Sequence, residues 1–180
     1  MNFKSFPEIT SERLLLRKIK ASDAETILFL RSYEAINKFI KRPESKKIKT
    51  IADAKKMIEN LEQSFDKHQS IAWGISLKDE PQLIGTIGIR NFSKNPKTAE
   101  VGYDLDTKFH RKGIMNEALQ VLIPFAFNEL KLEKIEAFTH FDNAASIQLL
   151  QKNEFQLNKK RKDSGYTSNI IFELENAKFS

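Results

Sequence analysis

Three strand-like segments in close succession, near the middle of the chain, restrict the fold more than any other feature. They cover residues 71–77, 82–92 and 98–106, and the second of them, QLIGTIGIRNF, alternates along its length. Turn sequences separate the segments, Asp79-Glu80-Pro81 after the first and Asn95-Pro96 after the second. The expected structure is an antiparallel meander.

Helical and strand-like segments on both sides extend this meander into a larger unit. Before the meander we expect a strand at residues 13–19 and helices at 24–30, 33–39 and 53–65. After it we expect a helix at 113–130, a strand at 134–140, a helix at 143–152 and a closing pair of strands at 155–160 and 166–174. No linker or internal repeat interrupts the chain. The order predicts one mixed α/β domain, residues 1–180, built on one central sheet.

Composition excludes several classes of protein. The 180 residues include no cysteine, which rules out a disulfide framework, a thiolate zinc site and a cysteine nucleophile. The three histidines, His68, His110 and His140, lack metal-ligand spacing, so no metal is expected. No apolar run reaches the roughly 20 residues of a membrane span, and the first residues do not form a secretion signal. A cytoplasmic protein is the expectation.

The net charge of +6 has two interpretations. It is either a solvated basic surface or the complement of an anionic ligand or partner, such as a polyphosphate cofactor or a nucleic acid. Local clusters at residues 46–49 and 159–162 lack the interleaved aromatic side chains of a single-strand binding platform. The pattern therefore disfavours nucleic acid.

A basic turn between a strand and a helix is the best candidate for a ligand site. The strand at 98–106 is followed by the basic and aromatic loop 108–112, and Gly113 begins the next helix. Unpaired backbone N–H groups and the helix dipole favour an anion such as a pyrophosphate at this point, and Gly113 leaves room for it. The alternative is an ordinary connection with solvated lysines, because the turn lacks the further glycines of a dinucleotide fingerprint and the ending of a P-loop.

The surrounding sequence resembles a known family. Residues 99–119 resemble the acyl-CoA-binding motif of the GNAT superfamily of N-acetyltransferases, in the branch of the ribosomal-protein N-terminal acetyltransferases; the matching pieces are Glu100-Val101-Gly102-Tyr103 and residues 112–118, KGIMNEA. Residues 143–155 are similar to the Asn-x-x-Ser helix and the Lys-x-Gly-Phe ending of that branch, and residues 10–17 to its opening strand. Three motifs in order, over about residues 9–174, make the resemblance specific.

The resemblance implies a GNAT-like acyl-CoA N-acyltransferase fold, with a single mixed, mostly antiparallel sheet of about seven strands flanked by helices. It also implies transfer of the acetyl group of acetyl-CoA to a primary amine, either a protein N-terminus or a small molecule, by direct attack. The pantetheine arm is expected in a gap beside residues 101–105. The residues implied in cofactor binding are Val101, Tyr103, Leu105, His110, Arg111, Lys112, Gly113, Ile114, Met115, Asn116, Asn143 and Ser146.

The same resemblance implies roles at the reacting groups for four of the matched residues, and three of them, Glu100, Asn143 and Tyr103, have a plainer alternative. Glu100 is the candidate general base, directly or through water, or else a solvated strand carboxylate. Ser146 lies one helical turn after Asn143 and is implied near the sulfur, as a proton donor to the thiolate. Asn143 either binds the pantetheine arm, caps its helix, or does both. Tyr103 either forms a wall of the acceptor pocket or packs in the core.

Three residues depart from the family pattern. His110 and Met115 stand where the superfamily has Gln or Arg and Gly or Ala, and Met115 is expected to narrow the approach to the pyrophosphate. The glycine before the late Phe is replaced by Glu154, so Asn153 is expected to supply the left-handed helix end.

Two other functions remain open from the sequence. One is a non-catalytic CoA-binding regulatory module that keeps the fold, and the other is a ribosome- or RNA-associated basic protein. A homodimer is left open as well. The acceptor depends on residues 27–51 and on the final hairpin, which carry the weakest patterns.

Overall fold

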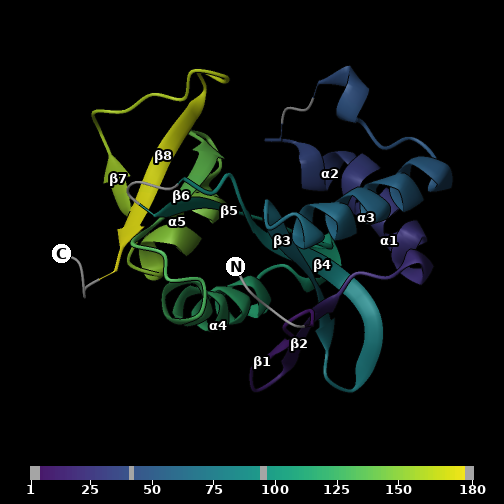
Figure 1. Cartoon of the computed structure of the whole chain (residues 1–180). Helices are drawn as coiled ribbons and strands as arrows, with labels where there is room; N and C mark the ends of the chain where they lie inside the picture. The colour runs from purple at the N-terminus through teal and green to yellow at the C-terminus, as the bar shows by residue number, and fades with distance from the viewer. Residues whose placement is uncertain (1–4, 41–42, 94–96, 177–180) are drawn as a thin grey trace.

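The structure, a computed structural model, describes residues 5–40, 43–93 and 97–176. One eight-stranded sheet, in the order β1-β2-β3-β4-β5-β6-β8-β7, forms its centre (Figure 1). Every neighbouring pair is antiparallel except β5 and β6. The predicted mixed, mostly antiparallel sheet is confirmed. The strand that the count of about seven missed is the two-residue β1, which is too short to leave a pattern.

The strands follow the sequence expectation closely. Their bounds are β1 Ile9–Thr10, β2 Leu14–Lys18, β3 Ser70–Leu77, β4 Glu80–Arg90, β5 Thr98–Leu105, β6 Lys134–His140, β7 Gln156–Asn158 and β8 Asn169–Glu175. The predicted position of the first turn, residues 79–81, is wrong in detail. The turn is Lys78–Asp79, and Glu80 and Pro81 belong to β4. A register shift nearby, between Ile75 and Leu77, makes room for a proline that cannot donate to the ladder. The turn expected at residues 95–96 lies outside the described residues.

The helices form two groups, which Figure 1 shows apart. Their bounds are α1 Ala24–Ser32, α2 Glu34–Asn37, α3 Ile51–Asp66, α4 Ile114–Asn128 and α5 Ala144–Lys152, with 3-10 turns at η1 Ala21–Asp23, η2 Glu44–Lys46 and η3 Thr107–Phe109. Apolar residues of α4 and α5 join the strands in the main core, while α1 and α3 form a second, smaller core with Ile19 and Leu83. Helices therefore cover both faces of the sheet, as the periodicity predicts.

The parallel pair at the centre of the sheet opens a gap. The two strands pair only at Thr98–Glu100 of β5 and Lys134–Glu136 of β6. Beyond this point β5 continues to Leu105 and β6 to His140, and they no longer pair with each other. Half of β5 thus has an edge without a strand partner, and an edge of this kind offers backbone donors and acceptors to a ligand.

Candidate functional site

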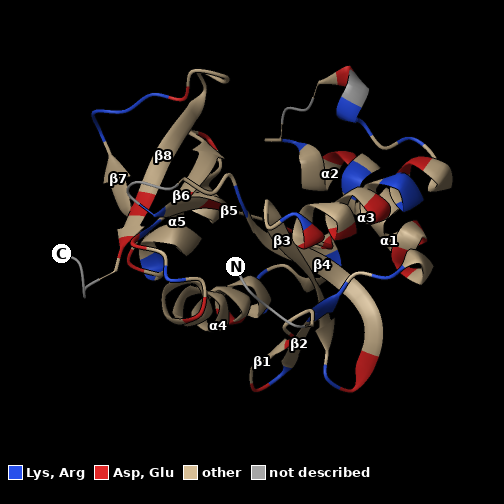
Figure 2. Cartoon of the chain, in the orientation of Figure 1, with Lys and Arg blue, Asp and Glu red and all other residues tan. Residues whose placement is uncertain are grey.

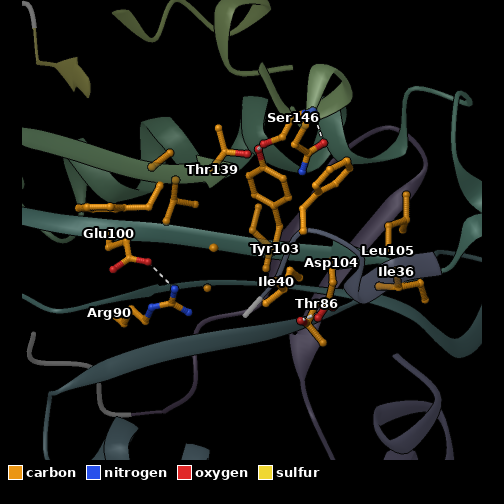
Figure 3. Close-up of a pocket in the computed structure, with 18 of the residues that line it drawn as sticks. Ile36, Ile40, Thr86, Arg90, Glu100, Tyr103, Asp104, Leu105, Thr139 and Ser146 are labelled. Carbon is orange, nitrogen blue, oxygen red and sulfur yellow. Dashed lines mark hydrogen bonds and ion pairs between the residues drawn. The ribbon is translucent and has the colours of Figure 1, made fainter. Parts of the chain in front are cut away.

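A continuous cleft of about 1820 Å³ extends over this gap, and Figure 3 shows part of its lining. Its walls come from β4, β5 and β6, the turn before α4, the first turns of α5, the segment from α2 to α3, and the β7–β8 loop. With one exception, the residues that the sequence predicts at the site line this cleft: Glu100, Val101, Tyr103, Leu105, His110, Arg111, Gly113, Ile114, Met115, Asn116, Asn143 and Ser146. The exception is Lys112.

The turn before α4 adopts a conformation that suits an anion. Gly113 is the residue that caps α4, with a φ of 76°, and Arg111 has a φ of 58°. These left-handed residues turn the chain into α4, whose first N–H groups have no partner within the helix. Residues 113–116, which carry those N–H groups, line the cleft. A side chain on Gly113 would meet no atom closer than Arg13 Nη2 at 3.5 Å. The space is therefore open to a ligand.

Met115 does not close this space. Its side chain is 8% exposed and belongs to the main core, together with Ile114. The expectation that Met115 narrows the approach is therefore wrong, because the side chain turns inward under the helix.

The side chains of His110 and Lys112 support the turn. His110 Nε2 lies 3.0 Å from the carbonyl oxygen of Leu105, which ties the loop to the end of β5. The ammonium of Lys112 lies 5.4 Å from the centre of the Phe109 ring, in cation–π contact.

An ion pair that the sequence did not indicate joins this turn to the N-terminal strands. Glu117, in the first turn of α4, accepts hydrogen bonds from the Arg13 side chain at 2.7 Å, from the Arg13 backbone N–H at 2.8 Å and from the Ser11 hydroxyl at 2.6 Å. Arg13 Nη1 also donates to the Lys112 carbonyl at 3.2 Å. Both Arg13 and Glu117 lie within matched motifs, but nothing in their spacing predicts that they meet.

Two hydroxyl groups meet on the α5 side of β5. Tyr103 and Ser146 are joined by a hydrogen bond of 2.9 Å, in which either oxygen can donate. Figure 3 shows the Tyr103 ring directed toward Ser146, on the opposite side of β5 from Glu100. Burial raises the pKa of Tyr103 to about 12, so that the phenol stays protonated at neutral pH. Each of the two hydroxyls has a proton with which it can donate a hydrogen bond.

Asn143 caps α5. Its Oδ1 accepts a hydrogen bond from the Ser146 N–H at 3.2 Å, and the residue also lines the cleft. The cap interpretation is confirmed, and the capping bond uses Oδ1 and not the two N–H donors of Nδ2.

Glu100 points to the other side of β5, where its carboxylate is held in place. Arg90 donates to Oε1, and Asn91 Nδ2 donates to Oε2 at 2.7 Å. The Glu100 side chain is only 14% exposed, so it is not the freely solvated carboxylate of the alternative interpretation. Each carboxylate oxygen keeps a second lone pair for a further donor.

A second ion pair, also missed from the sequence, lies farther along the same face. Asp104 accepts hydrogen bonds from Arg31 of α1 and, at 2.7 Å, from the hydroxyl of Thr86. Arg31 Nη2 donates to the same hydroxyl at 3.1 Å. These contacts fasten the end of α1 to the floor of the cleft.

The end of α5 differs from the expectation. Asn153 has a φ of −97°, and the left-handed residue is Glu154, with a φ of 67°. Asn153 is buried and uses its amide differently, because Nδ2 donates to Asn116 Oδ1 at 3.1 Å and to the Leu149 carbonyl at 2.9 Å. It joins α5 to α4, which explains why it does not take the left-handed position.

Within the described residues, no group of three or more His, Asp or Glu side chains is placed to hold a metal ion. None of the helices described is both long and apolar enough to cross a membrane.

Comparison with known proteins agrees with the geometry. The family model for the acetyltransferase (GNAT) domain matches residues 13–156. The chain is 32% identical to the uncharacterized N-acetyltransferase YoaA of Bacillus subtilis strain 168 over 151 residues, 84% of each chain. The crystal structure of the ribosomal-protein-S5-alanine acetyltransferase from Vibrio fischeri is similar, with a TM-score of 0.81, 26% identity, and 97% of this chain and 99% of that chain covered.

A second similar structure contains coenzyme A. It is that of RimL, a ribosomal L7/L12 α-N-protein acetyltransferase, in complex with coenzyme A, with a TM-score of 0.79, 19% identity, and 94% of this chain and 98% of that chain covered. At this identity it supports the fold alone. With the family match over most of the chain, these findings show that the chain belongs to the GNAT family of acetyltransferases, which transfer an acetyl group to an amine.

Proposed function

We propose that this chain transfers the acetyl group of acetyl-CoA to a primary amine by direct attack of the amine on the thioester. The observation that carries the proposal is the arrangement around the unpaired half of β5. A carboxylate, Glu100, lies on one side of the strand, and the protonated hydroxyl pair of Tyr103 and Ser146 lies on the other. A base on the amine side and an acid on the sulfur side are the two groups that this reaction needs.

The cofactor has a matching path along the cleft. Its pyrophosphate would bind the backbone N–H groups around residues 111–116, where the helix dipole favours an anion. The pantetheine arm would run along the open edge of Val101 to Leu105, with Asn143 Nδ2 as a donor to its amides. The thioester then reaches the part of the gap beside Tyr103 and Ser146. The GNAT family match over residues 13–156 supports this placement.

In the reaction itself, Glu100 accepts a proton from the amine, directly or through water. The nitrogen forms a bond to the thioester carbon, while an N–H group on the open edge of β5 stabilises the charge that develops on the carbonyl oxygen. The carbon–sulfur bond breaks, and the pair of Tyr103 and Ser146 gives a proton to the departing thiolate. Burial raises the pKa of Tyr103 to about 12, so its phenol carries a proton at neutral pH.

The test is release of free thiol from acetyl-CoA in the presence of primary amines, from small molecules to peptide N-termini. Purified protein should bind CoA and release thiol only when an amine is present, and Glu100→Gln should lower kcat while CoA affinity stays within about threefold. Tight CoA binding without turnover on any amine would contradict the proposal and favour a CoA-binding module.

A further inference from the structure

Two glycines lie in the floor of the cleft on the Glu100 side. Gly88 of β4 and Gly102 of β5 lie opposite each other in register, and both line the cleft. A β-carbon on Gly88 would lie 2.9 Å from the Ile71 carbonyl oxygen, and one on Gly102 would lie 3.1 Å from Arg90 Nη1. A side chain at Gly88 would collide with the backbone of β3, and one at Gly102 would collide with the Arg90 guanidinium, so the absence of a side chain at Gly102 lets Arg90 lie against the sheet beside the proposed base.

Two ion pairs lie on either side of these glycines, and their side chains differ in solvent exposure. Arg90 pairs with Glu100 two residues to one side of the glycines, while Asp104 lies two residues to the other side. At a rise of 3.3 Å per residue the pairs are about 13 Å apart. The Asp104 side chain is 1% exposed and both of its oxygens accept hydrogen bonds, whereas the Arg90 side chain is 57% exposed. Arg90 is therefore the most exposed charged side chain of the two pairs, since the Arg31 side chain is 16% exposed.

Among the described residues, the guanidinium of Arg90 donates one hydrogen bond, and much of the side chain is exposed. Its Nη2 donates to Glu100, and Nη1, Cζ and Nη2 would all lie between 3.1 and 3.4 Å from a β-carbon on Gly102. The group therefore rests against the Gly102 backbone. In the part of the chain that is described, Glu100 is its hydrogen-bond partner, and arginine has five N–H donors. Donors remain for a second anion, next to a carboxylate that is the proposed base.

We propose that the acceptor is a primary amine that carries a carboxylate or a phosphate a few bonds from its nitrogen. Arg90 binds the anionic group through paired N–H donors, a geometry that suits both carboxylates and phosphates. This places the amine next to Glu100, which takes its proton. The inference rests on the proposed acetyl transfer and names the substrate class for the same site.

The charge around the cleft agrees with an anionic acceptor. Lys46 and Lys47 line it from the segment between α2 and α3, and Arg161 and Lys162 line it from the β7–β8 loop. Figure 2 shows basic residues on both of these segments. Lys47 is paired with Glu44, and Arg161 with Glu136 and Glu173, so the excess positive charge of these segments comes from Lys46 and Lys162. An excess of this sign favours anions over cations, so a polyamine is a poor match.

The experiment compares pairs of acceptors that differ in the anionic group. The pairs are L-leucine with L-leucinamide, O-phosphoethanolamine with ethanolamine, and peptide amides that begin Ser-Asp with those that begin Ser-Asn; 1,5-diaminopentane is the cationic probe. Thiol release from acetyl-CoA gives kcat/KM for each. In at least one pair the anionic member should be preferred, by about 10- to 100-fold, which corresponds to a charge-assisted hydrogen bond. The pair that responds identifies a carboxylate, a phosphate or an acidic N-terminus as the source of the anion.

Variants of Arg90 assign the preference to this residue. Arg90→Met should bring the ratio within the preferred pair close to one, and Arg90→Lys should retain part of it, while CoA affinity is unchanged in both. Lys67→Met removes the same charge from an exposed residue that does not line the cleft, and should leave the ratio as it is.

The outcomes separate the acceptor class from acetyl transfer itself. Equal use of both members of all pairs, preference for the diamine, or an unchanged ratio in Arg90→Met would overturn the inference while acetyl transfer stands. Failure of every amine, neutral ones included, would overturn the proposed function as well.

Discussion

Arg13 and Glu117, which are 104 residues apart in the sequence, form an ion pair of 2.7 Å between Nε and Oε2 at the first turn of α4. Burial raises the pKa of Glu117, but the hydrogen bonds from Ser11 and Arg13 outweigh it and hold the pKa below its ordinary value, so the carboxylate is charged at neutral pH. Arg13 also donates to the Lys112 carbonyl, within the proposed phosphate-binding turn. The N-terminal strands therefore hold that turn in shape.

Arg13→Met should weaken CoA binding by about tenfold, because it removes the charged hydrogen bond to the Lys112 carbonyl. Without that bond, Arg111 and Gly113 are no longer held in their left-handed conformations. Calorimetric titration with CoA measures the loss. The acetyl thioester of N-acetylcysteamine, which has no phosphate, should keep its kcat/KM within about threefold and serves as the control. An equal loss with both substrates would place the effect of Arg13 elsewhere.

Gly113 gives a graded test of the same turn. Gly113→Ala requires an alanine at a φ of 76°, which costs on the order of 1–2 kcal/mol and should reduce CoA affinity modestly. Gly113→Glu adds a negative charge where the pyrophosphate is expected and should reduce the affinity far more. The affinities should fall in the order glycine, alanine, glutamate, as measured by titration with CoA. Unchanged affinity in Gly113→Glu would overturn the placement of the phosphate site.

The elements of the fold were predictable because their signals are local. Alternation within residues 82–92 and the glycine that begins α4 are both properties of a short window, and both segments form as expected. The two-residue β1 and the left-handed Glu154 were not predictable in this way, since a short strand has no period and the backbone of Glu154 follows from the amide contacts of Asn153.

The site was predictable only in part. The order of the motifs brought Glu100 and Ser146 to one cleft, but it did not place them on opposite sides of β5. The partners of Glu100 and Glu117 were missed, because Arg90 and Arg13 reach them through strand pairing and through the packing of α4 on β1 and β2. Contacts of this kind depend on tertiary structure and leave no pattern in sequence spacing.

Tyr103 and Ser146 should act as a unit in proton transfer to the thiolate. Tyr103→Phe and Ser146→Ala should each lower kcat, by about 10²-fold, and the double variant should lose little more than the worse single variant. The KM for acetyl-CoA should change by less than about threefold, because these hydroxyls are needed only when the sulfur departs. Steady-state kinetics on the natural protein, the two single variants and the double variant forms a double-mutant cycle that measures this coupling. Additive losses would indicate two independent roles.

The Arg31–Asp104 pair should be a main source of stability on the acceptor side. Asp104→Ala removes the buried carboxylate that pairs with the partly buried Arg31 and should lower the free energy of unfolding by about 2–4 kcal/mol. Thr86→Val removes one hydrogen bond to Asp104 and should cost about 1–2 kcal/mol. Urea unfolding measures both. Glu62→Gln removes the exposed partner of Lys18 and should cost no more than about 1 kcal/mol, as a matched surface control. A loss in Asp104→Ala as small as that of the control would contradict the structural role.

The Arg17–Asp23 pair should make stability depend on acid pH. Burial raises the pKa of Asp23, but hydrogen bonds from the Arg17 guanidinium and the Lys20 backbone N–H more than offset it and hold the pKa below the ordinary 3.8. A carboxyl with a lowered folded-state pKa binds protons less readily than the unfolded chain does, so its contribution is complete above pH 3.8 and is lost as the pH falls through the folded value. Asp23→Asn should therefore have a lower free energy of unfolding than the natural protein at pH 7. Between pH 7 and pH 3, the free energy of unfolding should fall by less in this variant than in the natural protein. Urea unfolding at both pH values measures this difference, and Ser22→Ala, an uncharged change at the exposed neighbouring position, should keep the full pH dependence. An unaltered pH dependence in Asp23→Asn would mean that other carboxylates carry the acid sensitivity.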